Sequence, residues 1–277
     1  MRGSVNELMG LFRDVVESVR SPHLRRVFFR SLSFNRRLIL WYANRLVRPE
    51  SQIETTERLH TIDELRKKGR SFTFISNHLT YADSHIIEVL LIRFGFADLA
   101  RHIIHIAGQK TFDFSRRFFT RSLNTVRVYQ PKARINKEFK KRMNARALKW
   151  AAHLKRRGYS VLVYPEGTRT RKHRTFNLTS ANPRTIIFFR HSSVIPVALM
   201  GAEKIMPVGK ILQNRAAVQL RIGEPIDHSQ LEAQFRKENP HHTDFQLNQE
   251  LISHYMNKIN DLLNPEYRFD LSSLIRQ

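Results

Sequence analysis

Apolar residues recur along this chain with two different periods, and the pattern changes near residue 50. Within the first fifty residues, the apolar positions from Leu8 to Val19 repeat at helical spacing, and Ser21-Pro22 interrupts the pattern. A second helical stretch, with arginines interleaved, runs from about Leu24 to Leu46. These patterns predict an N-terminal amphipathic helical hairpin over residues 1–50, followed by a larger domain over residues 51–277.

From about residue 60, short apolar runs alternate with stretches of helical periodicity. The predicted strands are Phe72–Ser76, His102–Ala107, Val126–Tyr129, Ser160–Tyr164, Val194–Leu199 and Val218–Ile222. The predicted helices are Thr61–Lys68, Ser84–Arg93, Asp113–Arg121, Phe139–Leu154, Arg184–Arg190 and Leu247–Leu262. This alternation indicates an α/β fold, in which a mainly parallel twisted sheet is flanked by helices.

A histidine and an aspartate, His78 and Asp83, follow the first of these predicted strands. In an open α/β sheet, ligands gather outside the carboxyl ends of the strands, so both side chains fall where a site is expected. A histidine there can take a proton from a substrate hydroxyl, and an aspartate can hold the ring and stabilise its charged form. The alternative is that Asp83 only caps a helix and His78 is a buried structural residue.

A second polar motif, Tyr164-Pro165-Glu166-Gly167-Thr168-Arg169, follows the run Val161-Leu162-Val163. Gly167 permits a sharp turn, Thr168 offers a hydroxyl, and Arg169 can bind a phosphate through two hydrogen bonds. On its own the motif also fits a polar turn followed by a solvated basic run. Because both motifs come at the ends of predicted strands, they predict one shared site.

Charge and composition narrow the class of partner. The chain has 48 lysines and arginines against 24 acidic residues, a net charge of +24, and it has no cysteine. The missing cysteines exclude disulfides, thiol catalysis and zinc–cysteine sites. Such a basic surface attracts polyanions, either an anionic membrane face or a nucleic acid. A hydrophobic content of 41% argues against a disordered chain that coats nucleic acid.

The N-terminal segment, residues 1–50, is the candidate for contact with a membrane. Charged residues interrupt it where a signal peptide would be apolar, and the run from Leu38 to Ala43 is far shorter than the roughly 20 residues of a membrane-spanning helix. If the substrate is a lipid, we therefore expect the protein to lie on the membrane, peripheral or monotopic. The hairpin could sit at the interface, or its apolar faces could pack on the main domain.

Together the motifs resemble those of the glycerolipid acyltransferase family, typified by lysophosphatidic acid acyltransferases. The first block of that family, Asn-His-x4-Asp, is matched by Asn77, His78 and Asp83. The third, Phe-Pro-Glu-Gly-Thr-Arg, is matched by 164–169 with tyrosine in place of phenylalanine. The fourth, an apolar strand carrying a proline, is matched by 194–199. The resemblance extends over about residues 60–230.

The resemblance implies transfer of a fatty acyl chain from acyl-CoA or acyl-carrier protein to the hydroxyl of a lysolipid. His78 would be the general base and Asp83 would orient and charge-balance it, whereas Glu166 would position the acceptor and Arg169 its phosphate. A backbone donor near Gly167 would serve as an oxyanion partner. The remaining substrate-binding residues would be Asn77, Thr168 and Lys110, the last at a position where the family often has a basic residue. No metal or other cofactor is expected.

The sequence departs from the family at two places. The second block, Gly-x-x-Phe-Ile-x-Arg, aligns with 124–130, where asparagine replaces the glycine and Gln130 replaces the phosphate-binding arginine. Arg127, Lys132 or Arg134 could supply the cation, but none is in register. After the third block, 176–179 replaces an expected Phe-Lys-x-Gly. Both departures weaken an assignment to phosphatidic acid synthesis in particular and favour another lysolipid or an amino-acid-linked lipid. The expected acceptor is 1-acylglycerol-3-phosphate or a related lysophospholipid.

These observations predict a membrane-associated O-acyltransferase on the cytoplasmic face of a membrane. An alternative within the same chemistry is a CoA-independent phospholipid transacylase, which could use the same histidine and aspartate. An alternative of another class is a basic nucleic-acid-binding protein. The sequence argues against it, since it contains no recognised DNA- or RNA-binding motif.

Overall fold

A single nine-stranded sheet forms the centre of the protein in the computed structural model. The structure describes residues 27–31, 33–112, 119–130, 133–167, 169, 176, 181–207 and 213–269. The strands follow the order β1-β5-β4-β6-β3-β7-β8-β2, and β9 pairs with β7. The five strands from β5 to β7 in this order are parallel to one another, so the predicted mainly parallel α/β sheet is confirmed.

The strands are short, and most lie within one or two residues of their predicted positions. They are β1 (Phe28–Phe29), β2 (Gln52–Glu54), β3 (Phe72–Ser76), β4 (Ile103–Gly108), β5 (Thr125–Val128), β6 (Ser160–Val163), β7 (Ser193–Met200), β8 (Gln219–Ile222) and β9 (Ile226–Asp227). β3 and β6 are buried along their whole length. This burial explains why both read as continuous apolar runs in the sequence.

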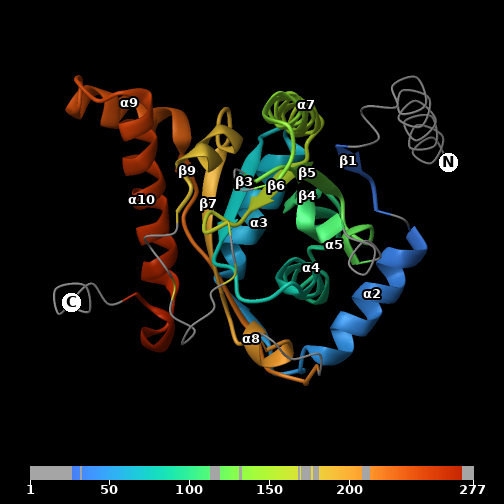
Figure 1. Ribbon diagram of the computed structural model, residues 1–277. Helices are drawn as coiled ribbons and strands as arrows, with labels where there is room; N and C mark the ends of the chain where they lie inside the picture. The colour runs from blue at the N-terminus through green and yellow to red at the C-terminus, as the bar shows by residue number, and fades with distance from the viewer. Residues whose placement is uncertain are drawn as a thin grey trace, which may run out of the picture.

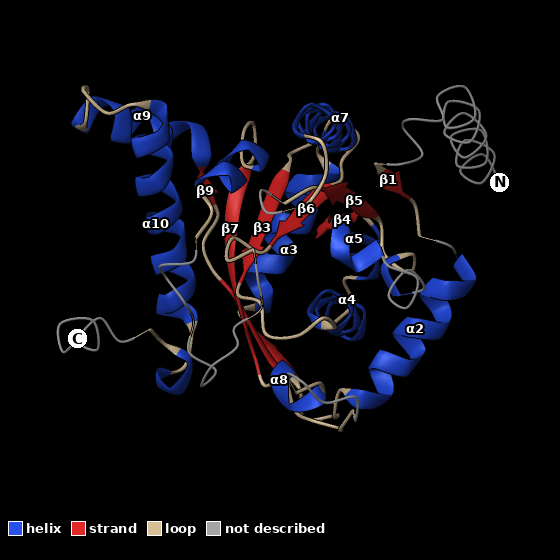
Figure 2. Ribbon diagram, in the orientation of Figure 1, coloured by secondary structure: helices blue, strands red, loops and turns tan. Residues whose placement is uncertain are grey.

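Helices cover the sheet on both sides (Figures 1 and 2). They are α2 (Ser33–Leu46), α3 (Thr56–Lys67), α4 (Asp83–Arg93), α5 (Ala97–Arg101), α7 (Lys137–Lys155), α8 (Ala202–Ile205), α9 (His228–Glu238) and α10 (Asp244–Leu262), with 3₁₀ turns η2 (Gln109–Phe112), η4 (Pro183–Phe188) and η5 (Pro265–Tyr267). α2 packs on α4, α7 on β5 and β6, and α10 on β7 and η4. The helix predicted at Arg184–Arg190 is instead the 3₁₀ turn η4.

The N-terminal prediction was only partly right. The helix expected from about Leu24 begins at Ser33, because Phe28 and Phe29 pair antiparallel with Val126 and Thr125 as strand β1. The first predicted helix, Leu8 to Val19, lies outside the described residues, as does most of Asp113–Arg121. Among the described residues, none of the helices has the length and apolar character needed to cross a membrane.

Candidate active site

The imidazole of His78 and the carboxylate of Asp83 meet at the carboxyl end of β3. His78 follows β3 by two residues, Asp83 begins α4, and His78 Nδ1 lies 2.8 Å from Asp83 Oδ2. The chain between them makes a turn, which brings the two side chains together although five residues separate them. With the Nδ1 proton directed at a carboxylate, the imidazole is in the tautomer that leaves Nε2 available as a base.

Asp83 is held in place by the turn that it closes. Its side chain is fully buried and accepts hydrogen bonds from Leu79 N at 2.7 Å and from Thr80 N at 3.0 Å. The Thr80 hydroxyl donates to the same carboxylate at 3.0 Å. These three donors fix the orientation of the carboxylate. Asp83 therefore has two roles, since it caps the turn before α4 and also orients His78.

Asn77 ties the site to the neighbouring strand. Its side-chain amide donates to the carbonyl of Leu199 at 2.8 Å and accepts from the amide of Leu199 at 2.8 Å. The Asn77 side chain thus takes the place of a strand backbone and extends the β3–β7 hydrogen bonding past the last backbone pair, Ser76 and Val197. Asn77 is buried and turned toward β7, so the structure gives it a positioning role. Contact with substrate stays a prediction.

Glu166 joins the two sequence motifs. Its carboxylate accepts the backbone N–H of His78 at 2.8 Å, and the residue is 4% exposed. The turn that carries it requires Gly167, whose φ of 65° is in the left-handed region. The Gly167 N–H donates to Tyr164 O at 3.0 Å. This amide is engaged within the turn, and a backbone oxyanion partner near Gly167 stays a prediction.

Tyr164 covers one side of the catalytic pair. Its ring stacks on the imidazole of His78, with centroids 4.3 Å apart and planes at 20°, and its hydroxyl lies 2.9 Å from Ser84 Oγ. Burial, together with the charge of Asp83, raises the pKa of the Tyr164 phenol well above its usual value. The phenol therefore stays neutral and serves as a hydrogen-bonding group. The sequence pattern did not single out either Tyr164 or Ser84 as a site residue.

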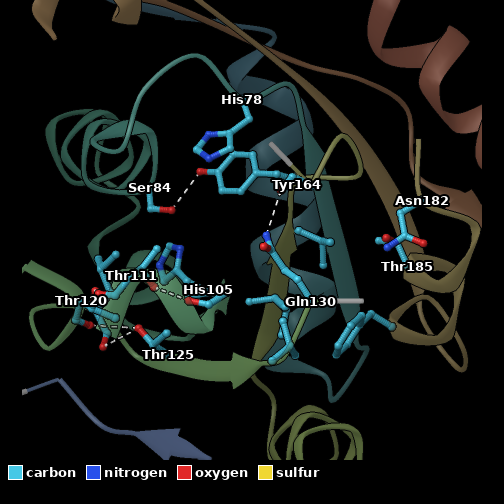
Figure 3. Close-up of a pocket in the computed structure, with 18 of the residues that line it drawn as sticks. His78, Ser84, His105, Thr111, Thr120, Thr125, Gln130, Tyr164, Asn182 and Thr185 are labelled. Carbon is cyan, nitrogen blue, oxygen red and sulfur yellow. Dashed lines mark hydrogen bonds between the residues drawn. The ribbon is translucent and has the colours of Figure 1, made fainter. Parts of the chain in front are cut away.

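A cavity of about 1330 Å³ opens beside His78. Figure 3 shows His78 and Tyr164 between two sides of it: Thr111, Thr120 and His105 gather on one side, and Asn182 and Thr185 lie on the other. Apolar residues of α2, and Ala82 just before α4, also line the cavity; those of α2 include Ile39, Ala43 and Leu46. A cavity of this size, partly apolar and beside a base, suits a substrate with a long hydrocarbon part.

Cations also line the cavity, on α7, in or just after η4, and in the second sequence motif. They are Lys137, Lys140, Lys141, Arg169, Arg184 and Arg190. Arg169 lies over the ring of Tyr81, with its guanidinium carbon 3.6 Å from the centroid. The three lysines escaped the sequence analysis because they fell within a basic segment. Their spacing would have placed them on one helical face had the N-cap Asn136 been recognised.

The altered second block lies beside the third. Gln130 lines the cavity, and its side-chain amide donates to Gly167 O at 3.3 Å. Arg127, one of the proposed replacement cations, is packed instead among the rings of Phe29, Phe112 and Tyr129. Gln130 therefore connects the two blocks.

The remaining predicted residues are less fully described. Lys110 belongs to the backbone of η2, directly after β4, while Thr168 and Lys132 lie outside the described residues. Within the described part of the chain, no three histidine, aspartate or glutamate side chains are grouped so as to hold a metal ion. His78, Tyr164, Gly167 and Arg169 all line the one cavity.

A His–Asp pair beside a large cavity, at the carboxyl end of a parallel strand, is suited to activating a hydroxyl group. The family model described as Acyltransferase matches residues 54–209, more than half of the chain and the part that carries His78, Asp83 and Glu166. The protein belongs to the acyltransferase family.

Two further proteins are similar to this chain. Over 129 residues the chain is 31% identical to the chloroplastic glycerol-3-phosphate acyltransferase of Carthamus tinctorius, a match that covers 44% of this chain and 28% of that relative. The crystal structure of the 1-acyl-sn-glycerophosphate (LPA) acyltransferase PlsC from Thermotoga maritima is 19% identical and covers 83% of each chain, with a TM-score of 0.48. This chain thus spans less than a third of the curated relative.

Proposed function

We propose that the protein transfers a fatty acyl group from an acyl thioester, acyl-CoA or acyl-carrier protein, to a hydroxyl of 1-acylglycerol-3-phosphate or a related lysophospholipid. The observation that carries the proposal is the 2.8 Å contact between His78 Nδ1 and Asp83 Oδ2 at the wall of the cavity. Membership of the acyltransferase family supports the reaction class.

The reaction follows from this geometry. Nε2 of His78 takes the proton of the acceptor hydroxyl, and the oxygen attacks the thioester carbonyl carbon. The tetrahedral intermediate then collapses, the carbon–sulfur bond breaks, and the imidazolium returns the proton to the leaving thiolate. Asp83 stabilises the imidazolium while it exists. No covalent enzyme intermediate is needed, since the acceptor attacks the thioester directly.

The charges around the cavity favour a phosphorylated acceptor. Arg169 and three lysines of α7 line the cavity, and guanidinium and ammonium groups bind phosphate through charge-assisted hydrogen bonds. Because one relative is named a glycerol-3-phosphate acyltransferase, glycerol 3-phosphate is the second candidate acceptor. It would place the same phosphate at the same cations without an acyl chain beside it.

The outer face of α2 supports work at an anionic membrane surface, which we place at the cytoplasmic face. Phe34, Leu38 and Trp41 are 72%, 41% and 53% exposed, and the guanidinium of Arg45 lies 4.4 Å from the Trp41 ring centroid. Their spacing puts them on one side of the helix, whereas Ile39 and Ala43 on the other side line the cavity. Aromatic rings flanked by arginines suit a lipid interface. A lysolipid leaving the membrane would meet the cavity beside this helix.

The test is acyl transfer by the purified protein, measured as thiol released from acyl-CoA in the presence of each acceptor. We expect transfer to 1-acylglycerol-3-phosphate to exceed transfer to glycerol 3-phosphate, and His78→Ala to abolish both. His241→Ala, at an exposed histidine far along the chain, is the matched control and should keep full activity. Full activity in a folded His78→Ala variant would overturn the mechanism, and transfer only from an intact phospholipid would favour a transacylase.

A further inference from the structure

One side of the cavity is polar where an acyl-binding wall is ordinarily apolar. We call this region the polar chamber and define it by five cavity-lining residues: His85, His105, Thr111, Thr120 and Thr125. Four of them are labelled in Figure 3, below Ser84 and away from Asn182 and Thr185. His85 and His105 are only 5% and 3% exposed. Burying imidazoles beside a hydrocarbon cavity is unfavourable unless their nitrogens find partners.

His85 presents a hydrogen-bond acceptor to the polar chamber. Its Nε2 lies 2.7 Å from Ser122 Oγ, and the Ser122 hydroxyl itself donates to Phe119 O at 2.5 Å. Since the serine proton is directed at that carbonyl, Nε2–H of His85 is the donor, which leaves Nδ1 with a lone pair. Burial lowers the pKa of His85 to about 4, so the ring is neutral at physiological pH and the lone pair is available.

His105 forms part of the wall behind this acceptor. Its Nε2 lies 2.9 Å from Glu88 Oε1, and Arg36 approaches the other oxygen of the same carboxylate at 2.7 Å. The carboxylate, already balanced by the guanidinium, accepts the Nε2 proton. Nδ1 of His105 is buried and has no hydrogen-bond partner in the described part of the chain, so it is closed to a ligand and only adds to the polarity of the wall.

The threonines add to the same polarity. The hydroxyl protons of Thr111 and Thr125 are directed at backbone carbonyls, of Gly108 at 2.8 Å and of Thr120 at 3.1 Å. Neither hydroxyl therefore offers its proton to the cavity, and each can only accept there. The polar chamber is thus rich in acceptors and poor in donors. It is complementary to a group that carries an O–H, and it repels a carboxylate or phosphate.

The polar chamber lies on the side of the cavity where the acyl chain would run. Ile39 and Ala43 line the cavity from α2, which packs on the helix α4 that carries His85, whereas the cations that suit a phosphate lie on α7 and around η4, which pack on each other. His85 is only two residues after Asp83 on α4, so it lies roughly 3 Å along the helix axis from the residue that orients His78. A chain whose thioester carbonyl is at His78 would therefore pass the polar chamber with its first few carbons.

We infer that the polar chamber recognises a hydroxyl group on the acyl chain, so that the protein selects hydroxyacyl thioesters over plain ones. This inference rests on the proposed acyl transfer and specifies its donor. The hydroxyl would donate to Nδ1 of His85. A plain chain would cover that acceptor and leave it unpaired, which is the strongest form of discrimination that a binding site offers.

The test compares acyl-CoA donors of one chain length, with and without a hydroxyl on the first carbons beyond the thioester carbonyl, against a fixed acceptor. We expect kcat/KM for the hydroxylated donor to be about tenfold higher or more. Calorimetric binding of the same two donors gives a readout that does not need turnover. Equal kcat/KM and equal affinity would overturn the inference and leave acyl transfer standing, whereas no transfer from any thioester would remove the proposed function.

Two variants of His85 separate recognition from a structural role. In His85→Asn the side-chain oxygen stands near the position of Nδ1, so the hydroxyl preference is retained although the Ser122 contact is lost. In His85→Gln the amide reaches Ser122 but leaves no acceptor at Nδ1, so the preference falls toward unity while the fold is kept. The reverse order would assign His85 to positioning Ser122 alone. His102→Gln, at a histidine outside the cavity lining, is the control.

An O–H group could instead belong to the acceptor, and a further pair of reactions distinguishes the two sources. With a plain donor held constant, acceptors that differ by one hydroxyl are compared in the wild type and in His85→Gln. If the variant changes only the ratio of kcat/KM between the two donors, the hydroxyl belongs to the acyl chain, as inferred. If it changes only the ratio of kcat/KM between the two acceptors, the acyl-chain assignment is wrong.

Discussion

The phenol ring of Tyr164 stacks on the imidazole of His78 with 4.3 Å between ring centroids, and its hydroxyl lies 2.9 Å from Ser84. Tyr164→Phe keeps the stack and removes one neutral hydrogen bond, which we expect to lower stability by about 1 kcal/mol while most activity remains. Tyr164→Ala removes the ring that confines the imidazole, and kcat should fall much further. Chemical denaturation and steady-state kinetics on both variants measure this, and equal kcat losses would contradict it.

The hydrogen bond from His78 to Asp83 fixes which ring nitrogen carries the proton. Asp83→Asn would present an amide that can donate to Nδ1, which favours the wrong tautomer and takes the charge away from the imidazolium. We expect kcat/KM to fall on the order of 10³-fold to 10⁴-fold. The variant should be measured beside Asp98→Asn, a change at an exposed aspartate on α5. A loss below about tenfold would show that Asp83 only caps the turn.

Asn77 makes two hydrogen bonds to Leu199, so its removal should be felt in folding as well as in activity. Asn77→Leu leaves the buried N–H and the buried carbonyl of Leu199 without these partners. We therefore expect the free energy of unfolding to fall by about 2 kcal/mol or more. Urea denaturation measures it. If Asn77→Leu keeps wild-type stability but raises KM for the acceptor, Asn77 contacts substrate, as the motif alone predicts.

The exposed aromatic face of α2 predicts membrane binding that depends on particular side chains. Trp41→Ser should lower the affinity for vesicles rich in phosphatidylglycerol by about tenfold, because it removes a large interfacial ring. Co-sedimentation with the vesicles measures this affinity. Phe245→Ser is the matched control, since Phe245 is 60% exposed on α10, at the far side of the sheet (Figure 1). Equal losses in the two variants, or tighter binding to duplex DNA than to vesicles at physiological salt, would contradict the membrane assignment.

Lys155 gives the protein a pH-dependent stability. Its Nζ contacts Phe188 O at 2.5 Å and Ser192 Oγ at 2.9 Å, yet burial lowers its pKa to about 7. The unfolded chain, with an ordinary lysine pKa, binds more protons than the folded one above pH 7. Stability should therefore rise between about pH 7 and pH 10, with a slope of at most about 1.4 kcal/mol per pH unit from this group.

The measurement subtracts the pH profile of Lys155→Met from that of the wild type, because other groups titrate in the same range. The charge of Lys155 is one of the causes that lower the pKa of His228, so the substitution also alters that histidine and the comparison is made above pH 7. Below pH 7 both states hold the lysine proton, so Lys155 itself adds no slope there. A difference that is flat from pH 7 to pH 10 would mean that the carbonyls of Phe188 and Arg190 and the hydroxyl of Ser192 keep the lysine charged.

Much of the fold could be read from the sequence because the central strands are buried on both faces. β3 and β6 were predicted within one residue for this reason. β1 was missed because Phe28 and Phe29 pair with a strand nearly a hundred residues away, a contact that local periodicity does not encode. β2 was missed because only one of its three residues, Ile53, is buried.

The site divides in the same way. The pairing of His78 with Asp83 could be predicted from a motif, since a single turn brings the two together. The contact between His78 N and Glu166 could only be expected as proximity, because it depends on how β3 and β6 align. The polar chamber could not be predicted at all. His85 and His105 come from different elements, and in the sequence each looks like an ordinary structural histidine.

Both edges of the central sheet are very short strands, the two residues of β1 beside β5 and the three residues of β2 beside β8. Short edge strands give other chains little backbone to pair with, and they protect against aggregation. A shortened chain that starts after Phe29 would leave β5 as a bare edge. For expression and crystallisation, cutting before Val27 is therefore the safer choice, since it keeps that edge sealed.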